Sequence, residues 1–291
     1  MKIFLSVNLL LLCFCSSLFS DISTEPLVTA EKYIEYMRKH GLYNQFVPPK
    51  IIIVCYEQGA LQHLLESNPT IKVSQSLAHL YLTENGSIGI LCGWGLGAPV
   101  LAIRIEELIG LGVTKFITVG TAGSLMGKYQ IGEFIIAQKA LAEDGVANLY
   151  LNGKAYANAD AKLSATWNEF SKNHALPNFH TAGTWSFSAI FRETPADVIR
   201  VTKEGYNVVD MEAATLYAIG QEKGAQTLSL FVISDILTDK TWAIHMMEPK
   251  VTNNLYKLSE WVLEFCKNEV KYVNECIPES KKSNASQCQP N

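Results

Sequence analysis

The sequence predicts an α/β fold in which a mostly parallel sheet is covered by helices on both faces. Short, continuous apolar runs alternate along the chain with longer amphipathic segments. The former are typical of strands buried on both faces, and the latter are typical of helices. The 291 residues are 48% apolar and 18% charged, as in an ordinary globular protein. No internal repeat and no linker interrupts the alternation, so we expect one domain.

The first 20 residues have the layout of a secretory signal peptide. Lys2 is followed by a mainly apolar stretch from Ile3 to Phe19, and polar residues begin at Ser20. We expect cleavage after Ser20 and a secreted or periplasmic protein. The alternative is a membrane anchor, but the apolar run is shorter than the roughly 20 residues of a spanning helix. No later segment is apolar enough to span, so no stable membrane span is expected after signal removal.

The domain is expected over residues 21–277, followed by a polar tail at 278–291 that we expect to be disordered. Helices are predicted at 26–40, 60–66, 98–111, 159–174, 195–204, 212–223 and 249–273. Strands are predicted at 50–56, 71–74, 79–83, 87–93, 115–120, 132–138, 179–186, 207–211 and 225–234.

Charge and cysteine content exclude several function classes. The net charge is -4 and no basic run is longer than the pair Lys281–Lys282, so no nucleic-acid partner is expected. Neither CxxC nor HExxH occurs, so no metal is expected. Cys55 and Cys92 lie in apolar runs and are expected to be buried thiols. One disulfide is plausible among the late cysteines, which are Cys266, Cys276 and Cys288.

Ligands of such sheets bind beyond the carboxyl ends of the strands, so the residues after each strand are the candidates. The strand at 87–92 ends in the glycine turn Gly93–Gly97, whose spacing does not match a dinucleotide fingerprint and which can also reflect tight packing. The strand at 115–119 ends in Gly120–Ser124, a predicted turn. There the backbone amides and the Thr121 hydroxyl can meet an anion or a sugar oxygen.

Acidic residues follow the last two buried strands. Asp210 and Glu212 flank Met211 where a strand runs into a helix, and strand alternation places both carboxylates on one side. Such a carboxylate suits the paired hydroxyls of a ribose, although acids in a first helical turn also suit the helix dipole. Asp235 follows the strand at 225–234, where partial desolvation can raise its pKa enough for acid catalysis. The alternative for Asp235 is a helix cap or an ion pair.

Four motifs in this order resemble the nucleoside phosphorylase and nucleosidase family, which includes purine nucleoside phosphorylases, uridine phosphorylases and methylthioadenosine nucleosidases. The motifs are GWGLGAP (93–99), VGTAGSL (119–125), VVDMEAATLYA (208–218) and VISD (232–235), and the resemblance extends over about residues 50–273. It implies a three-layer α/β/α sandwich with a mixed, partly barrel-like central sheet. It also implies cleavage of a nucleoside N-glycosidic bond, with phosphate or water as the acceptor.

The resemblance also implies roles for individual residues. Met211 and Glu212 would bind the ribose, and Asp235 would protonate or hydrogen-bond the leaving base. The phosphate or nucleophile side would be formed by Gly95, Thr121 and Arg192, and the base side by Trp185, Phe187, Phe191 and Ser234. Core packing is the alternative for the aromatic residues. No cofactor is implied beyond phosphate as a co-substrate, and a homo-oligomer (dimer, trimer or hexamer) is expected.

The acceptor side departs from the pattern of the family. Phosphorylases carry an arginine after the first strand and often another before the VG[ST] turn, but here these places hold Cys55–Ala60 and Thr118. Nucleosidases carry a glutamate cluster after the first strand. Only Glu57 is present, and the matching register is closer to Gly59. We expect phosphorolysis to free base and ribose 1-phosphate. The alternatives are a hydrolytic nucleosidase and a non-catalytic storage or binding protein of the same fold.

Overall fold

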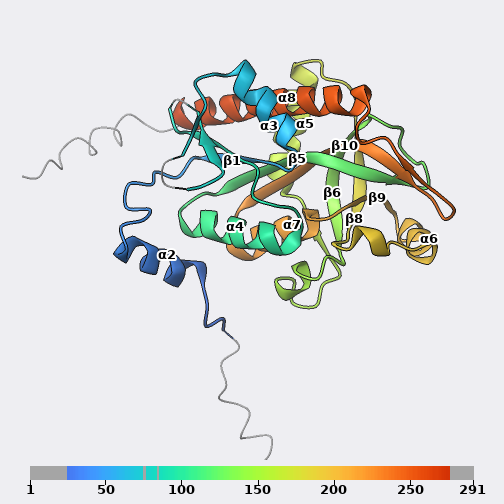
Figure 1. Ribbon diagram of the computed structural model, residues 1–291, viewed down its shortest axis with the longest axis horizontal. Helices are drawn as coiled ribbons and strands as arrows, with labels where there is room; N and C mark the ends of the chain where they lie inside the picture. The colour runs from blue at the N-terminus through green and yellow to red at the C-terminus, as the bar shows by residue number, and fades with distance from the viewer. Residues whose placement is uncertain (1–24, 75–76, 84, 276–291) are drawn as a thin grey trace, which may run out of the picture.

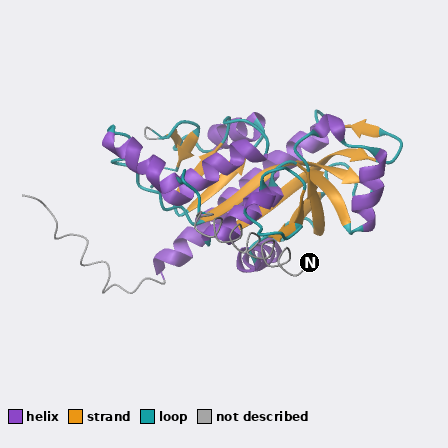
Figure 2. Cartoon of the chain, turned by 90° about the horizontal axis from the view of Figure 1, so that it is seen from below, coloured by secondary structure: helices purple, strands orange, loops and turns teal. Residues whose placement is uncertain are grey.

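The computed structural model describes residues 25–74, 77–83 and 85–275. The expected signal peptide at 1–20 and the expected polar tail at 278–291 lie outside the described residues. Within them, a strongly curved sheet lies between two layers of helices (Figures 1 and 2). The predicted α/β class and the three-layer arrangement are therefore confirmed.

The described strands form one eleven-stranded mixed sheet. Its order is β11-β10-β6-β8-β9-β5-β1-β4-β3-β2, with β7 paired to β6. The strands are β1 (Ile51–Cys55), β2 (Lys72–Val73), β3 (Leu80–Leu82), β4 (Ile88–Leu91), β5 (Lys115–Leu125), β6 (Phe134–Ala142), β7 (Tyr156–Asn158), β8 (Phe179–Ser186), β9 (Tyr206–Asp210), β10 (Gln226–Leu237) and β11 (Trp242–Ile244). The apolar runs of β1 and β4 are buried at every position, as expected for strands covered on both faces.

One end of the sheet closes on itself. β10 pairs with β6 on one side and with β5 on the other, so β10, β6, β8, β9 and β5 form a closed ring. β5 and β10 are 11 and 12 residues long, which gives them enough length to pair within the open sheet and the ring. The expected partly barrel-like sheet is confirmed.

Helices cover both faces of the sheet (Figure 1). One layer contains α3 (Gln58–Ser67), α5 (Ala161–Asn173) and α8 (Pro249–Glu275), and the other contains α4 (Ala98–Gly110) and α7 (Ala213–Lys223). α2 (Ala30–Lys39) contacts α4, and α6 (Pro195–Lys203) contacts β9. Two short 3-10 helices, η1 (Ala147–Leu149) and η2 (Ile190–Arg192), complete the described elements.

Two apolar clusters hold these layers together. The larger one fills the space between the sheet and its helices, and includes an aromatic group in which the Trp167 ring lies 5.3 Å from Phe265 across α5 and α8. The smaller one lies between the ring of strands and α6, and is formed by Leu125, Leu141, Trp185, Val198, Val201, Tyr206 and Val209. Both clusters include residues of the strands that carry the candidate site residues.

The structure differs from the sequence-based expectation at several strands. The predicted turn at Gly120–Ser124 is instead part of β5, because β9 and β10 supply hydrogen-bond partners for this glycine-rich segment. β10 likewise continues past Asp235 to Leu237, and β7 and β11 were not predicted. The added lengths of β5 and β10 lie where the ring closes, and β7 and β11 pair with β6 and β10 outside the ring. Local propensity does not report such long-range pairing.

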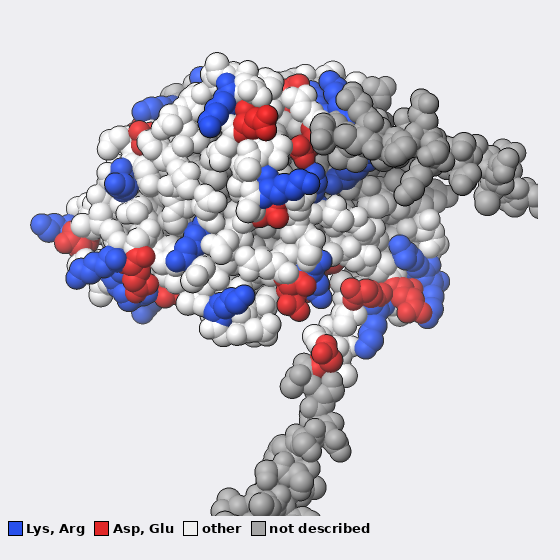
Figure 3. Space-filling view, turned by 180° about the vertical axis from the view of Figure 1, so that it is seen from behind, with Lys and Arg blue, Asp and Glu red and all other residues white. Residues whose placement is uncertain are grey.

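The surface and the cysteines add three observations. Basic and acidic side chains are interspersed over the face in Figure 3. Within the described part of the chain, no helix is long and apolar enough to cross a membrane. Cys266 is fully buried and carries a free thiol, so it is not part of the expected disulfide. Cys276 and Cys288 lie outside the described residues.

Candidate active site

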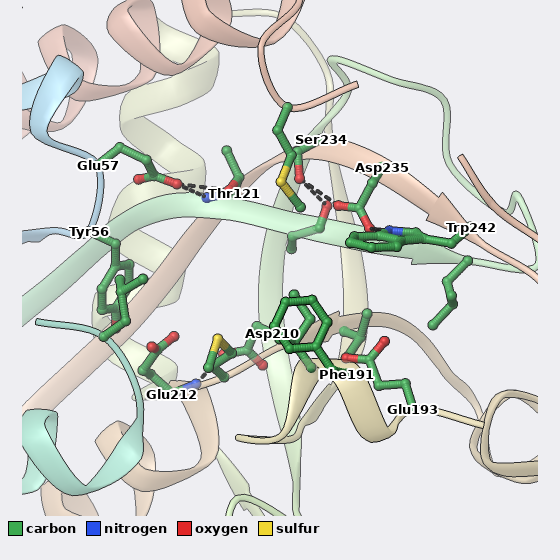
Figure 4. A pocket seen from close by; sticks show the side chains of 18 residues that line it. Tyr56, Glu57, Thr121, Phe191, Glu193, Asp210, Glu212, Ser234, Asp235 and Trp242 are labelled. Atoms are coloured by element: carbon green, nitrogen blue, oxygen red, sulfur yellow. Dashed lines mark hydrogen bonds between the residues drawn. The ribbon is translucent and has the colours of Figure 1, made fainter. Parts of the chain in front are cut away.

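A cavity of about 480 Å³ lies where β1, β5, β9 and β10 meet the start of α7 (Figure 4). Its lining contains five carboxylates, which are Glu57, Glu193, Asp210, Glu212 and Asp235. No lysine or arginine is among the described residues that line it. The cavity therefore has a strongly acidic lining, which disfavours an anionic ligand.

The carboxylates are distributed between two ends of the cavity. In Figure 4, Glu57 and Glu212 lie at one end beside Tyr56, and Glu193 and Asp235 lie at the other end. We call the first the β1 end (Tyr56, Glu57, Thr121 and Glu212) and the second the β11 end (Glu193, Ser234, Asp235 and Trp242). Phe191 lies between them. The separation places different chemistry at each end.

Asp210 organises the change from β9 to α7. Its Oδ1 accepts hydrogen bonds from the hydroxyls of Thr184 and Ser186 at 2.8 and 2.7 Å. Its Oδ2 accepts from the backbone N–H groups of Glu212 and Ala213 at 2.8 and 2.6 Å. Asp210 thus satisfies backbone donors at the N-terminus of α7, which would otherwise lack partners. Asp210 therefore holds the backbone of Glu212 in place. The side chain of Asp210 also lines the cavity.

Glu212 is held from the glycine turn. Its Oε1 accepts a 2.6 Å hydrogen bond from the Gly97 N–H, and the φ of +94° at Gly97 requires glycine there. Burial and the nearby Asp210 raise the pKa of Glu212 to about 8. Glu212 and Met211 line the cavity as predicted for the ribose-binding pair, but Gly95 does not. The glycine turn instead contributes Leu96 to the lining and the Gly97 amide to Glu212.

The raised pKa of Glu212 makes the stability of the protein depend on pH. Between the ordinary pKa near 4.5 and the folded value near 8, the folded state binds a proton that the unfolded state has lost. The stabilisation that this proton provides is therefore complete below about pH 4.5, and it is lost as the pH rises through 8. We expect the free energy of unfolding to fall by about 5 kcal/mol over this interval, at ~1.4 kcal/mol per pH unit. In Glu212→Gln, urea denaturation at pH 5.5 and 8.5 should show a smaller fall. An equal fall in both proteins would contradict this assignment.

Glu57 lies between β1 and α3 and turns its side chain toward β5. Its Oε1 accepts hydrogen bonds from the N–H and the hydroxyl of Thr121 at 3.0 and 2.8 Å. Its Oε2 is buried and has no hydrogen-bond partner among the described residues. Burial raises the pKa of Glu57. The donors of Thr121 that were expected to meet an anion are therefore already bound by a carboxylate of the chain itself.

The alignment of this segment with the nucleosidase pattern favours Gly59 over Glu57 as the position of the glutamate. Gly59, the position expected to match a nucleosidase glutamate, lies in α3, where a Cβ would come 3.0 Å from the Tyr256 hydroxyl. Glu57, two residues earlier, lines the cavity, whereas Gly59 does not. The signal in the sequence was an isolated glutamate at the end of a buried strand.

A bulge aims Asp235 into the cavity. The β10–β5 register shifts between Ile233 and Asp235, so Ser234 is the extra residue. Asp235 accepts hydrogen bonds on both oxygens, from the Ser234 hydroxyl at 2.7 Å and from the Trp242 indole N–H at 2.8 Å. A Cβ at Gly123 would lie 3.0 Å from Oδ2, so glycine leaves the room this carboxylate needs. Ser234 and Asp235 both line the cavity, and their roles toward the base stay predictions.

Two residues of the β11 end were not predicted. Trp242 lies on β11, a three-residue strand that pairs with β10. Glu193 follows η2, and burial together with the nearby Asp235 raises the pKa of Glu193 to about 7. The sequence offered only weak signals for them, namely a tryptophan soon after the VISD motif and an acid after the aromatic segment 185–191.

Besides Gly95, three further predicted residues are not brought to the cavity. Thr184 and Ser186 both point toward Asp210, so alternation along β8 directs Trp185 to the opposite side. Trp185 is fully buried beside α6 and donates a 2.7 Å hydrogen bond from its indole to Glu143. Phe187 stacks on Trp185 at 4.7 Å, so both belong to the core, as the alternative interpretation had it. Arg192 is exposed and does not line the cavity.

Phe191 is the predicted base-side aromatic residue that borders the cavity. Its side chain is 87% exposed, so most of the ring is open to solvent. Among the described residues, no group of three or more His, Cys, Asp or Glu side chains is arranged to hold a metal ion. Carboxylates, hydroxyls and aromatic rings line the cavity.

A sequence model of the phosphorylase superfamily matches residues 50–265. The chain belongs to this superfamily, an enzyme family of nucleoside phosphorylases and nucleosidases. The matched segment contains all five carboxylates of the cavity.

Curated relatives are distant from this member of the superfamily. The chain is 28% identical over 169 residues to a "Purine nucleoside phosphorylase DeoD-type" of Buchnera aphidicola, which covers 56% of the chain and 70% of the relative. It is 28% identical over 136 residues to a "Guanosine phosphorylase" of Halorubrum lacusprofundi, covering 46% of the chain and only 55% of the relative.

Solved structures share the fold. A purine nucleoside phosphorylase of Toxoplasma gondii has a TM-score of 0.68 at 16% identity, covering 77% of this chain and 93% of the other. A uridine phosphorylase of Vibrio fischeri has a TM-score of 0.64 at 22% identity, covering 86% and 100%. A 5'-methylthioadenosine/S-adenosyl homocysteine nucleosidase of Campylobacter jejuni has a TM-score of 0.64 at 15% identity, covering 76% and 99%.

Proposed function

We propose that this protein cleaves the N-glycosidic bond of a nucleoside by hydrolysis and releases the free base and the pentose. The single observation that carries the choice of water over phosphate is the contact of Glu57 with both donors of Thr121. An arriving phosphate would meet a carboxylate where it needs hydrogen-bond donors.

The charges around the cavity support the same choice. A phosphate carries up to two negative charges near neutral pH, and it would lie beside the Glu57 carboxylate. No described basic side chain lines the cavity to compensate for them. A neutral water molecule carries no such penalty.

Glu57 has the properties of a base for water. Its Oε2 is a buried acceptor without a partner, so a water that donates to it would satisfy it. Its pKa is raised by burial, which brings its basicity nearer to that needed at neutral pH. Thr121 fixes the other oxygen and with it the direction in which Oε2 points.

The remaining groups suit the substrate. Glu212 lies beside Met211 and can both donate to and accept from paired ribose hydroxyls in its protonated form. The transition state of glycoside cleavage is oxocarbenium-like, with positive charge on the sugar. The acidic lining stabilises that positive charge, and the β11 end faces the base.

The proposal is tested by measuring release of base from a panel of purine and pyrimidine nucleosides by the full chain, with and without inorganic phosphate. We expect base and free pentose in phosphate-free buffer, no acceleration by phosphate and no pentose 1-phosphate. Base release that requires phosphate would overturn hydrolysis. Absence of turnover on the whole panel would instead support the storage or binding alternative.

Phosphorolysis is the second candidate, because the curated relatives are named purine nucleoside and guanosine phosphorylases. It would require Glu57 to leave Thr121 so that the Thr121 N–H and hydroxyl can face the anion. The same assay distinguishes the two, since pentose 1-phosphate forms only by phosphorolysis.

A further inference from the structure

Trp242 is carried to the cavity by the hairpin of β10 and β11. In this antiparallel pair Trp242 lies opposite Leu237, and Ile244 lies opposite Asp235. Residues directly opposite one another share a face of the sheet, and so do Asp235 and Leu237, which are two residues apart. The indole is therefore on the same face as the Asp235 carboxylate, and both side chains line the cavity.

Hydrogen bonds fix the hairpin on both sides of β11. In the turn before it, the Thr238 N–H donates to the Thr241 carbonyl at 2.9 Å. The Thr238 hydroxyl oxygen accepts from the N–H groups of Lys240 and Thr241 at 3.1 and 3.0 Å. After β11, the His245 N–H donates to the Ser234 carbonyl at 3.1 Å. The position of the indole is thus set by the backbone of the hairpin.

The indole makes its hydrogen bond at its edge and leaves its ring faces free. Its N–H donates to Asp235 Oδ2 at 2.8 Å, and the Ser234 hydroxyl donates to Oδ1 at 2.7 Å. Each oxygen of this carboxylate keeps a lone pair that can accept from a ligand. Trp242 is 40% exposed, although it lines a cavity. A flat ligand could therefore cover a face of the ring and meet Asp235 with its edge.

Phe191 supplies a second aromatic ring across the cavity. In Figure 4, Trp242 lies on the wall formed by β10 and β11, and Phe191 lies on the opposite wall beside η2. Both rings line the cavity, so the space between them belongs to it. Every nucleobase has a π-face that stacks on aromatic side chains, whatever its hydrogen-bonding groups.

We propose that Trp242 binds the base by stacking on it across from Phe191, and that its indole N–H positions Asp235 at the edge of that base. This inference rests on the proposed nucleoside cleavage and adds a residue to the base side of the same site. Trp242 then provides the aromatic contact that the family resemblance implies for Trp185, which the structure places in the core.

The first test measures binding of free bases, which requires no turnover. Calorimetric titration of the full chain with adenine, hypoxanthine and uracil gives Kd for each. We expect Trp242→Leu to raise Kd ~5–100-fold, the loss of one base–aromatic stack. Trp242→Phe keeps a ring and should bind nearly as the parent does. Trp261→Phe is the matched control, because Trp261 is a partly buried residue of α8 outside the cavity.

Tryptophan fluorescence tests the stacking without a destabilising substitution. A bound base should quench the emission of the parent and of Trp261→Phe, and this quenching should be lost in Trp242→Phe. The other tryptophans of the chain, Trp94, Trp167 and Trp185, do not line the cavity.

Steady-state kinetics separates the two roles of the indole. Trp242→Phe lacks the N–H but keeps a ring, so we expect KM close to the parent value and kcat lower by ~10–100-fold, the loss of a hydrogen bond to a charged group. Trp242→Leu should raise KM as well. A purely structural role would lower thermal stability without separating kcat from KM in this way.

The outcomes distinguish this inference from the proposed function. Unchanged Kd in Trp242→Leu, or full quenching in Trp242→Phe, would overturn the stacking role, as would a parent that binds none of the bases. Unchanged kcat in Trp242→Phe would overturn the positioning role. A parent that binds bases through Trp242 but cleaves no nucleoside without phosphate would contradict the proposed hydrolysis and leave the assignment of Trp242 standing.

Discussion

Replacing Glu57 by glutamine is expected to lower base release in phosphate-free buffer by ~10²–10⁴, the usual contribution of a positioned general base. The amide of Glu57→Gln can still accept from Thr121 through its oxygen, so the geometry of β5 and α3 should be kept. It cannot take a proton from water. Steady-state kinetics on one nucleoside, with thermal unfolding as the folding check, measures the effect.

The same substitution is expected to have the opposite effect on turnover if the enzyme uses phosphate. Removing the negative charge beside Thr121 would then open the anion site, and turnover with phosphate would rise. An increase in phosphate-dependent turnover would therefore contradict the role given to Glu57. Gln62→Glu, which adds a charge at an exposed position of α3 outside the cavity, should change neither activity and serves as a control for charge in general.

Asp210→Ala should produce the largest loss of stability, about 3–5 kcal/mol in the free energy of unfolding. It removes the shared acceptor of two hydroxyls and two backbone N–H groups, all buried. A buried donor left without a partner costs about 1–3 kcal/mol, and part of this is recovered by local relaxation. Urea denaturation followed by tryptophan fluorescence measures the change.

Asp144→Ala is a matched control for this prediction. Asp144 is also buried and accepts hydrogen bonds from the N–H groups of Val146 and Ala147 and from the Thr215 hydroxyl. It does not line the cavity. Both variants should be destabilised, but only Asp210→Ala should also raise KM for the nucleoside, because Glu212 loses its anchor. Equal KM values in the two variants would show that Asp210 does not position Glu212.

The alternation of strands and helices, and much of the lining of the cavity, could be predicted from local patterns in the chain. The buried run at 50–56 contains β1, and the segments 179–186 and 195–204 correspond to β8 and α6 within one residue. Met211, Glu212, Thr121, Ser234 and Asp235 all lie at the predicted site. These predictions succeeded because hydrophobic period and motif order are local properties of the chain.

Contacts between distant segments of the chain complete the site, and local patterns do not predict them. Glu57 and Thr121, which are hydrogen-bonded, are 64 residues apart in the sequence. The Asp235 carboxylate accepts a hydrogen bond from the Trp242 indole of β11, a strand too short to be predicted. Trp185 was placed wrongly because its neighbours Thr184 and Ser186 face Asp210, a partner on another strand. Local periodicity separates the two faces of a strand, but long-range pairing decides which face meets the core and which meets the cavity.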